Sequence, residues 1–582
     1  MNNDSLHRVR ALSALVAATL VAACGGGSDA PPPPPPPPAA TLSLQGTAAT
    51  GAAISGAAVT AKCNGGTGTA TTAANGTYAI ALTAGTLPCA LKVAAAGGDL
   101  HSVVAGSGAT ASANITPITQ LIVANLAGKD PATYFSAFAA SDITALTSSA
   151  VDGAQAKVVS VLKNNGVDAS TLGNLITGSL VAANGSTAGN ALDQILDTLK
   201  TKLSTSGVTL AQLVTTMLQT VTTATPSSDV LVAVDVALQP KAASCAALRS
   251  GSYRVVVPTV GTIGSFGSQS TDLVSVNVTA LTVTSLTGNP VTLTPMAGSP
   301  CRFTTSGGGD IVVSQSGALG IKTGDGYFGF GFPEQTIALA DLAGNWNFLG
   351  FDRGNRTDPL GPTSITASVS SVGVVAFTSL CADAKTCVTT GLPSPPLTVN
   401  TAGGGYDINF SATEKSRLFA FRAGGGELLL VGVGEDGTWT IGTHLRTNPL
   451  PAVGAVNLFW NVEATNALVG TTYGPTGLAI TDGSNTIMSA DSANDFFTRN
   501  NVTNFTGPIT RPETIYANKV AGTARQGYRW RQPATGVINS AGATVNVPEF
   551  IQIPLRGMGL TATVSPNANV AASRYGLSVT KP

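Results

Sequence analysis

Histidine, a common general base and zinc ligand, is scarce in this chain. Of its three histidines, His7 lies in a signal-like N-terminal segment, which leaves His101 and His444 for the folded part. Two histidines cannot make a three-histidine zinc site, and the motifs H-E-x-x-H and G-x-S-x-G do not occur. A Ser-His-Asp arrangement through His444 stays open, although His444 stands in strand-like sequence, where a structural histidine is the more common case. We therefore predict no metal site and assign no catalytic residue.

Carboxylates offer a second kind of chemistry, because two of them at a suitable separation can hydrolyse a glycoside. The candidates are Asp325, Glu427, Glu435, Asp436 and Asp495. Sequence spacing does not show whether any two of them converge, and solvated carboxylates are ordinary in a turn such as the one that holds Glu435 and Asp436. A carboxylate-dependent hydrolase is therefore one alternative function.

Two glycine-rich stretches, 324–329 and 432–437, match the pattern G-x-G-x-x-G. A dinucleotide site needs this turn to open a helix, whose N-terminus holds the pyrophosphate. Strand-like sequence follows both stretches, and Asp436-Gly437 is typical of a hairpin turn. We therefore predict no cofactor.

The thiol of Cys24 is the residue with the clearest chemistry. A short basic region with Arg8 and Arg10 precedes an apolar run, 11–23, that is too short to span a bilayer and ends in small residues. The sequence Val21-Ala-Ala-Cys24 resembles the lipobox of bacterial lipoproteins. The resemblance implies cleavage before Cys24 and lipidation of its thiol; an ordinary signal peptide with an incidental cysteine is the alternative.

The residues after Cys24 are predicted to form a spacer. Eight prolines, Pro31–Pro38, rise about 3.1 Å each as polyproline, which makes a stiff segment of about 25 Å. In enteric-type sorting an aspartate directly after the cysteine retains a lipoprotein in the inner membrane, whereas this chain has Gly25. We therefore expect a lipid-anchored protein of the outer membrane.

The other cysteines are predicted to form disulfides. Without Cys24 six remain, an even number of the kind that an oxidising compartment favours. Their clustering along the chain predicts the pairs Cys63–Cys89, Cys245–Cys301 and Cys381–Cys387, although six cysteines allow fifteen connectivities. With this pairing no free thiol remains for catalysis or metal binding.

Charge gives no support for nucleic-acid binding. Charged residues make up 10% of the 582 residues, and 30 basic side chains balance 30 acidic ones. Such a surface has no long-range field that would attract a phosphate backbone. The anchor makes the membrane the one partner that we predict; a protein, a glycan and a small apolar ligand stay open as further partners.

Short Thr/Val/Ala strands with glycine turns predict a small β-sandwich over 41–98. Two stretches of this region resemble the carboxypeptidase-regulatory-like and Ig-like modules of bacterial surface proteins. They are Gly51-Ala-Ala-Ile-Ser-Gly56-Ala-Ala-Val59 and Thr72-Ala-Ala-Asn75-Gly76-Thr-Tyr78. The resemblance implies a hairpin at Asn75-Gly76 whose aromatic residue enters the core. Cys63 and Cys89 depart from the usual pattern of those modules, and we expect them to join two strands.

Over 115–225 the apolar period changes from two to 3.6, which predicts a helical bundle. Asp130 before Pro131 is a helix start signal, and Asp142 is expected to cap a helix that runs to about Asn164. The apolar stripes are expected to pack against one another; a groove for a partner helix is the alternative.

From Cys245 onward the sequence is β-rich, and it predicts antiparallel barrels or sandwiches over 245–340 and 341–582. Each of these two regions contains a glycine two residues before an aromatic residue. The two similar stretches are Leu248-Arg-Ser-Gly251-Ser-Tyr253 and Leu342-Ala-Gly344-Asn-Trp346. The fold class is therefore multidomain and mainly β, in this order: signal peptide (1–23), lipidated cysteine with proline linker (24–40), sandwich (41–98), helical bundle (115–225) and the two β regions.

Aromatic residues mark a possible cavity in the β-rich part. Phe328, Phe330 and Phe332 share one face of a strand, which is typical of a core face but also of an apolar cavity wall. Gly344-Asn-Trp346 resembles the Gly-x-Trp that opens the first strand of lipocalin-like barrels, which implies a tryptophan at the barrel floor. Trp439 is a further candidate for the wall.

These observations favour a non-enzymatic, surface or periplasm-facing lipoprotein that displays a binding or structural region. A lipocalin-like carrier of a small apolar ligand and the carboxylate-dependent hydrolase are the alternatives. A large apolar cavity in the β-rich part would favour the carrier, and two converging carboxylates would favour the hydrolase. A solid, well-filled core would favour the protein that only displays a binding or structural region.

Replacement of the thiol tests the anchor. We expect Cys24→Ser to abolish acylation and to release the chain from membrane fractions, because the hydroxyl does not take the place of the thiol as acyl acceptor. Cell fractionation with fatty-acid labelling measures both. Unchanged membrane fractionation of the variant would contradict the lipidation of Cys24.

Overall fold

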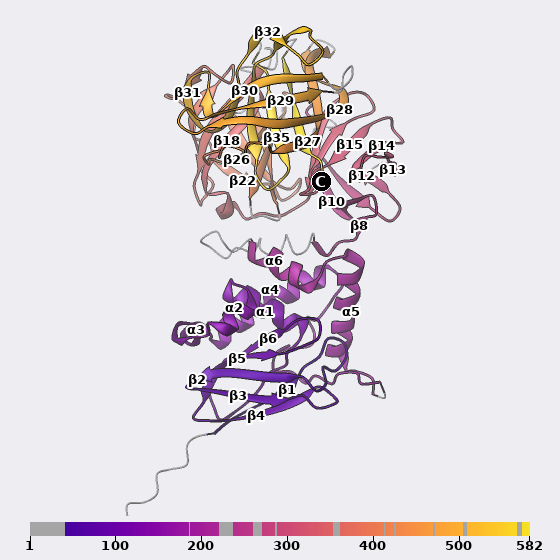
Figure 1. Ribbon diagram of the computed structural model, residues 1–582, viewed down its shortest axis with the longest axis vertical. Helices are drawn as coiled ribbons and strands as arrows, with labels where there is room; N and C mark the ends of the chain where they lie inside the picture. Colours follow the sequence, from indigo (N-terminus) through magenta and orange to yellow (C-terminus); the bar gives the residue numbers. More distant parts are fainter. Residues whose placement is uncertain are drawn as a thin grey trace, which may run out of the picture. The chain divides into compact units, whose positions relative to one another are not determined.

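The computed structural model describes residues 41–185, 187–219, 237–259, 271–285, 288–352, 361–411, 414–423, 427–469, 472–503, 509–566 and 573–582 (Figure 1). The chain divides into Met1–Ala40 and Thr41–Pro582, and the described residues all belong to the second unit. The predicted signal peptide, Cys24 and the proline linker lie outside them. None of the helices in the described ranges is long and apolar enough to cross a membrane.

Two small sheets make up the first folded part, drawn in indigo in Figure 1. Their strand orders are β4-β1-β7 and β3-β2-β5-β6. The strands are β1 (Thr41–Thr47), β2 (Ala58–Asn64), β3 (Gly66–Thr71), β4 (Thr77–Thr83), β5 (Thr86–Val93), β6 (Leu100–Val104) and β7 (Thr110–Ser112). Buried and exposed side chains alternate along β1, β2 and β4, so each sheet turns one face to a core, as a sandwich requires. The predicted sandwich is present, and its strands continue past residue 98 to Ser112.

The turn at Asn75-Gly76 differs from the expectation. It joins β3 to β4, which belong to different sheets, so it links the two layers instead of closing a hairpin. The turn that does close a hairpin in this region is at Gly65, between the paired strands β2 and β3. Tyr78 does enter the core, where its hydroxyl donates a hydrogen bond to the carbonyl of Ala113.

Helices follow the sandwich and share its core. They are α1 (Pro117–Ala127), α2 (Pro131–Ser136), α3 (Ala140–Ala145), α4 (Ser148–Asn164), α5 (Ala191–Ser206) and α6 (Leu210–Gln219). The stripe Leu192, Leu196 and Leu199 of α5 is buried in the same cluster as Leu44 and Val59 of the sandwich. The helices therefore complete one core with the sheets and do not form a separate bundle.

Helix capping explains where two of these helices begin. Asp130 caps α2 as predicted, because its carboxylate accepts a hydrogen bond from the Thr133 amide at 3.0 Å. Asp142, however, lies inside the short helix α3, where it accepts from the Ala139 amide. Thr147 is the residue that caps the long helix α4, through the Ala150 amide at 3.2 Å. The expected cap was wrong because a turn at Leu146 separates the two helices.

The first β unit of the C-terminal part is a closed barrel, drawn in magenta to pink in Figure 1. A two-stranded sheet, β8 (Lys241–Ala242) and β9 (Cys245–Arg249), precedes it. The barrel strands are β10 (Gly251–Val256), β11 (Asp272–Asn277), β12 (Thr282–Ser285), β13 (Val291–Pro295), β14 (Arg302–Thr305), β15 (Asp310–Val313), β16 (Leu319–Lys322) and β17 (Phe328–Pro333). Each strand pairs with the next, and β17 pairs with β10 to close the ring.

The second β unit is a nine-stranded sheet with the order β21-β20-β19-β18-β26-β25-β24-β23-β22. Its strands are β18 (Gly344–Asp352), β19 (Gly361–Val369), β20 (Val375–Cys381), β21 (Cys387–Val388), β22 (Leu397–Val399), β23 (Tyr406–Ser411), β24 (Glu414–Arg422), β25 (Leu428–Gly434) and β26 (Trp439–His444). The Val375 amide donates to the Pro395 carbonyl at 3.0 Å, and the Leu397 amide donates to the Gly373 carbonyl at 2.8 Å. These bonds join the beginning of β20 to the beginning of β22, so the sheet curls into a barrel that is open along part of its seam. We call this unit the central barrel.

The third β unit is again a closed barrel, which we call the last barrel. Its strands are β27 (Val456–Val469), β28 (Thr472–Asp491), β29 (Phe496–Thr503), β30 (Ile509–Val520), β31 (Thr523–Arg531), β34 (Phe550–Leu555), β35 (Leu560–Val564) and β36 (Arg574–Thr580). A hairpin of β32 (Ala534–Ile538) and β33 (Thr544–Val547) is inserted between β31 and β34. Sequence reasoning expected one β unit over 341–582, whereas the structure has two.

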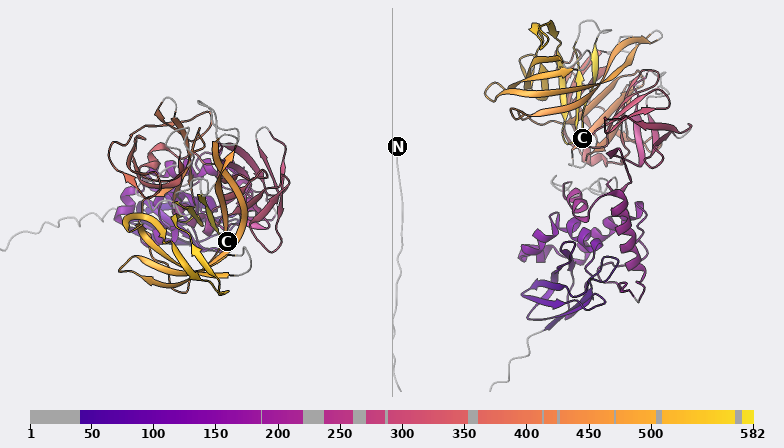
Figure 2. Two further views of the ribbon diagram at one scale, coloured as in Figure 1. Left: turned by 90° about the horizontal axis from the view of Figure 1, so that it is seen from above. Right: turned by 45° about the vertical axis from the view of Figure 1, so that its right-hand side comes forward.

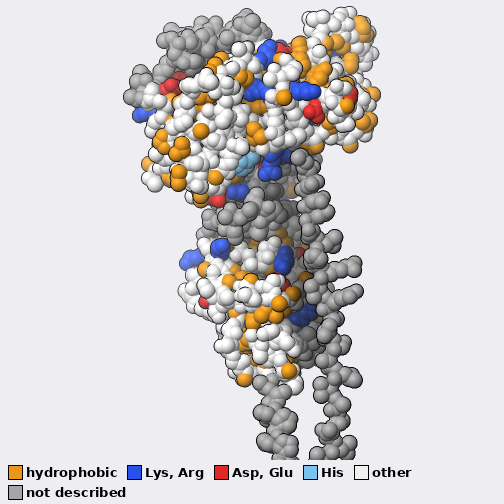
Figure 3. Space-filling view, turned by 90° about the vertical axis from the view of Figure 1, so that its left-hand side faces the viewer, with side chains coloured by type: hydrophobic (Ala, Val, Ile, Leu, Met, Phe, Trp, Pro, Cys, Tyr) orange, Lys and Arg blue, Asp and Glu red, His pale blue; other side chains and the backbone are white. Residues whose placement is uncertain are grey.

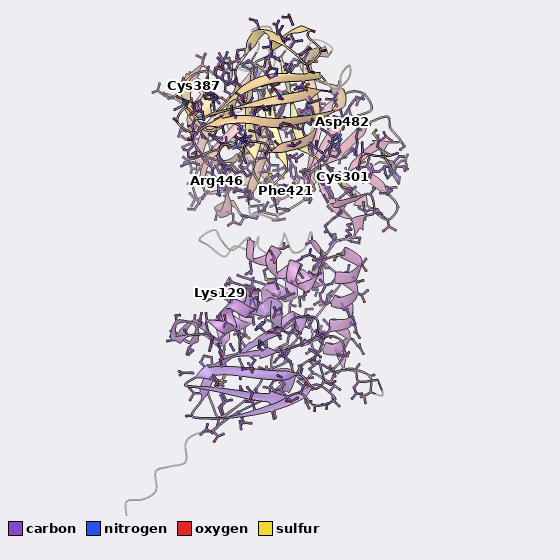
Figure 4. The ribbon with its side chains drawn as sticks, viewed as in Figure 1. Lys129, Cys301, Cys387, Phe421, Arg446 and Asp482 are labelled. Atoms are coloured by element: carbon purple, nitrogen blue, oxygen red, sulfur yellow. A yellow bond between two sulfur atoms is a disulfide. The ribbon has the colours of Figure 1, made fainter. Side chains whose placement is uncertain are left out.

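Three disulfides have the predicted pairing: Cys63–Cys89, Cys245–Cys301 and Cys381–Cys387. Cys63 stands opposite Cys89 on the neighbouring strands β2 and β5, as expected. Figure 4 labels Cys301 and Cys387, one cysteine from each of the other two bonds.

A continuous hydrophobic core joins the three β units. The Phe328 ring of the first barrel lies 5.6 Å from the Trp439 ring of the central barrel and 5.2 Å from the Tyr575 ring of the last barrel. The strands approach so closely that a Cβ on Gly320 of β16 would come within 2.8 Å of Val462 in β27. Figure 2 shows the pink strands of the first barrel beside the orange and yellow strands of the last barrel.

Truncation of Phe328 tests this shared core. We expect Phe328→Ala to lower the free energy of unfolding by about 3–5 kcal/mol, because it leaves a cavity where three aromatic rings meet. Urea titration followed by tryptophan fluorescence measures the change for this part of the chain, since all four tryptophans lie between residues 346 and 530.

The matched control is Leu458→Ala, at a side chain of β27 that is 53% exposed. Its effect should stay within about 0.5 kcal/mol. Equal effects of the two substitutions would contradict the role of the core.

Candidate functional site

The inner face of the central barrel is apolar. Residues alternate along β18, so that Trp346 and Phe348 both point inward and stack with their ring centroids 6.0 Å apart. The short helix η1 (Leu339–Leu342) precedes the strand, and the indole Nε1 of Trp346 donates to the Leu342 carbonyl at 2.8 Å. Trp346 is fully buried and its one polar atom has a partner. It is therefore a fixed part of the core of the central barrel.

His444 packs against Trp346. Its ring centroid lies 4.1 Å from that of Trp346, on the neighbouring strand β26. Gly344 has a φ of +144° and lies against the ring, since a Cβ there would come within 3.2 Å of the histidine Cδ2. Burial, together with the positive charges of Arg446 and Arg422, lowers the pKa of His444 to about 4. The imidazole is therefore neutral at neutral pH and acts as a packing residue.

A cavity of about 290 Å³ lies within the central barrel. Its wall is built from apolar side chains of seven strands, among them Phe348, Ile365, Phe377, Ile408, Phe410 and Leu430. Gly442 makes room for the ring of Phe348, which lines the cavity, because a Cβ at this position would come within 2.3 Å of that ring. The ring and the glycine face each other as register partners on β18 and β26.

The mouth of the cavity is polar. Thr438 is its centre: its hydroxyl donates to Asp352 at 3.1 Å and its amide donates to Asp436 at 3.0 Å. Ser416 and Lys415 of β24 also line this end. An apolar interior with a few polar groups at one end is the usual chemistry of a small-molecule site, in which burial gives affinity and the polar groups give orientation.

The structure places the aromatic residues that the sequence singled out in two locations. Trp346 lies in the core of the central barrel beside Phe348, and it is not among the residues that line the cavity. Phe328, Phe330 and Phe332 lie in the core shared with the neighbouring units, against the outer face of the central barrel. Trp439 lies in the same core, and Figure 4 labels Phe421, whose ring is 5.8 Å from that of Phe332.

The five candidate carboxylates lie at four places, because Glu435 and Asp436 share the turn between β25 and β26. Asp325 is in the turn between β16 and β17, and Asp495 stands just before β29. Glu427 forms an ion pair with Arg446 at 3.3 Å, and Glu435 is buried at the turn between β25 and β26. Asp436 is the one of these five that lines the cavity.

Sequence reasoning missed the residues that actually form the wall. Phe348, Ile365, Phe377 and Phe410 come from four different strands, β18, β19, β20 and β23, and no motif connects them. The available signal was local: Val375 and Phe377, like Ile408 and Phe410, are spaced by two, which predicts that each pair shares one face of a strand.

Acid titration tests the buried histidine. The folded-state pKa of about 4 lies below the ordinary value of 6.5, so the contribution to stability is complete above pH 6.5 and is lost as the pH falls toward 4. We expect the free energy of unfolding to fall by roughly 1–2 kcal/mol between pH 8 and pH 5, and this loss to be absent in His444→Gln. Urea titrations at both pH values, followed by tryptophan fluorescence, measure it; an identical loss in wild type and variant would contradict the assignment.

No protein-family model matches the chain. No curated protein matches it. Among solved structures, crystal structures of two mutants of the vaccine antigen transferrin binding protein B from Haemophilus parasuis match, with sequence identities of 8% and 6%. Each match covers 57% of this chain and 75% of the other, with a TM-score of 0.17. At this TM-score the similarity carries no argument about fold or function.

Proposed function

We propose that this protein is a lipid-anchored, non-enzymatic binding protein of the cell envelope, and that its central barrel holds a small apolar ligand. The observation that carries the proposal is the cavity of about 290 Å³, whose wall is built mainly from apolar side chains of the central barrel. A protein that only displays a folded surface would gain stability from filling this space, because each unfilled methylene in a core costs about 1 kcal/mol.

The cavity volume indicates the size of the ligand. A dry apolar cavity of about 150 Å³ is large enough to bind benzene, so this cavity suits a molecule of roughly ten to twelve heavy atoms. Such a molecule would bury its apolar part against Phe348 and Leu430 and would place a hydroxyl or a similar group near Thr438 and Thr440 at the mouth. The ligand is therefore an apolar compound with one polar end.

The envelope location rests on the N-terminal sequence and on the disulfides. We infer an outer-membrane anchor from the lipobox-like sequence that ends at Cys24. The three disulfides suit an oxidising compartment. The face of the molecule in Figure 3 carries few charged side chains among many uncharged ones, in keeping with the 10% of charged residues in the chain. A sparse charge pattern of this kind gives no electrostatic attraction to nucleic acids.

Titration with 2-naphthol, which has eleven heavy atoms and one hydroxyl, tests the site. We expect the folded chain to bind it with a dissociation constant in roughly the micromolar range and with a negative heat-capacity change, since binding buries apolar surface. Ile365→Trp places a larger side chain in the cavity and should weaken binding by at least about tenfold. Isothermal titration calorimetry at two temperatures measures both quantities.

Val399→Trp is the matched control, because it adds the same side chain to a strand of the same barrel at a position that is 60% exposed. It should leave the dissociation constant unchanged. Absence of binding to the wild type, or equal loss in both variants, would refute the proposal.

A further inference from the structure

The inner face of the last barrel differs from that of the central barrel, because it is polar. Along β27 the residues Asn457, Asn461 and Glu463 point inward, while Trp460 and Val462 between them point outward into the shared core. The cavity inside it has about the same volume, 290 Å³, but amide, hydroxyl and guanidinium groups make up most of its lining, beside the rings of Phe459, Phe497 and Phe550.

Arginine dominates the charge of this interior. The carboxylate of Glu513, on β30, accepts hydrogen bonds from Arg499 at 2.9 Å, from Arg511 at 2.6 Å and from Arg531 at 3.0 Å. Glu513 is fully buried, which opposes its ionisation, but the three guanidinium groups outweigh burial and lower the pKa of its carboxyl to about 2. One negative charge is thus shared by three positive charges.

Arg529, on β31, adds a fourth guanidinium that lines the cavity. Its Nε is buried without a hydrogen-bond partner, and within the described part of the chain no acidic side chain lies at ion-pair distance from it. It lies over the Phe497 ring, with 5.5 Å between the guanidinium carbon and the ring centroid. Burial lowers the pKa of Arg529 to about 10, so the group is still charged at neutral pH.

Asn501, the neighbour of Arg499 on the same face of β29, is also incompletely bonded. Its side chain is 5% exposed, lines the same cavity, and its amide oxygen has no partner among the described residues. The side-chain amide can present either its oxygen or its NH₂ group to the cavity. A ligand with both donors and acceptors can therefore bond to it.

The charges inside the last barrel do not balance. Three arginines (Arg499, Arg529 and Arg531) and one carboxylate (Glu463) line the cavity, and the Arg511–Glu513 pair lies beside them. Burial raises the pKa of Glu463. These four guanidinium groups outnumber the two carboxylates by two, even when both carboxylates are ionised. A buried charge without a partner destabilises the fold, and packing of the surrounding side chains does not compensate for this cost. An unpaired guanidinium in a cavity is therefore expected where a ligand supplies the opposite charge.

We propose that the last barrel is a second binding site, which takes a small hydrophilic anion with a carboxylate or phosphate group. The guanidinium of Arg529 would pair with the oxyanion, since a guanidinium donates two parallel hydrogen bonds to such a group. Asn501 and Gln552 would bind hydroxyl groups of the ligand. The site is separate from the apolar cavity and does not depend on the function proposed for it.

Calorimetric titration of the full chain at low ionic strength tests the site with three probes: glucuronate, inorganic phosphate and glucose. We expect at least one anion to bind at roughly millimolar concentration or below, and to raise the thermal unfolding temperature, while neutral glucose does neither. Preference for glucuronate or for phosphate tells which oxyanion the site takes. Added salt should weaken the interaction, because it screens the charges.

Arg529→Met separates a binding role from a structural one. The methionine fills similar volume without the unpaired charge, so the variant should be as stable as the wild type or more stable, yet bind the anion at least about tenfold more weakly. Lys519→Gln removes one positive charge from the same barrel outside the cavity lining and should leave the affinity unchanged.

The cavity variant Ile365→Trp should retain anion binding, so failure of the apolar site and failure of this site are distinguishable. Absence of binding for both anions, or loss of affinity in Lys519→Gln equal to that in Arg529→Met, would overturn the proposal. A strongly destabilised Arg529→Met that binds normally would overturn it as well, because Arg529 would then be a structural residue.

Discussion

The C-terminal part of this protein depends on one aromatic contact, in which Phe328, Trp439 and Tyr575 bring three β units into a common core. A strand has only two faces, and side chains on them alternate. When the outer face of a barrel is buried against its neighbours, apolar side chains must occupy that face. The chemistry of the inner face is then free to differ from one barrel to the next.

The central barrel and the last barrel use this freedom in opposite ways. Strand β18 is apolar on both faces: Phe348 points into the cavity and Phe351 packs into the shared core. Strand β27 carries Trp460 on the outer face and Asn461 on the inner face. Two cavities of about the same volume therefore have contrasting linings, one suited to an apolar molecule and one to a polar anion. Because the outer core supplies the hydrophobic stabilisation, the last barrel can tolerate a cationic interior.

Local sequence signals predicted features that depend on neighbours in the chain. The spacing of the cysteines gave the disulfide pairs, since each pair closes a segment within one unit. Both Gly251-Ser-Tyr253 and Gly344-Asn-Trp346 begin a strand, β10 and β18, as their echo indicated. The same reasoning failed at Asn75-Gly76 and at Asp142. There the local signal was genuine, but the partner strand or the end of the helix was decided by packing elsewhere.

The sequence alone determined the mainly β class, the disulfide pairing and the position of Trp346 at the start of a strand, because each follows from composition, period or short spacing. Only the tertiary structure decided that Phe328 faces a neighbouring unit, that Phe348 and Phe410 share a cavity, and that Glu513 is shared by three arginines. Strand pairing brings these residues together across long stretches of chain, and the period of two assigns a face without saying what that face will meet.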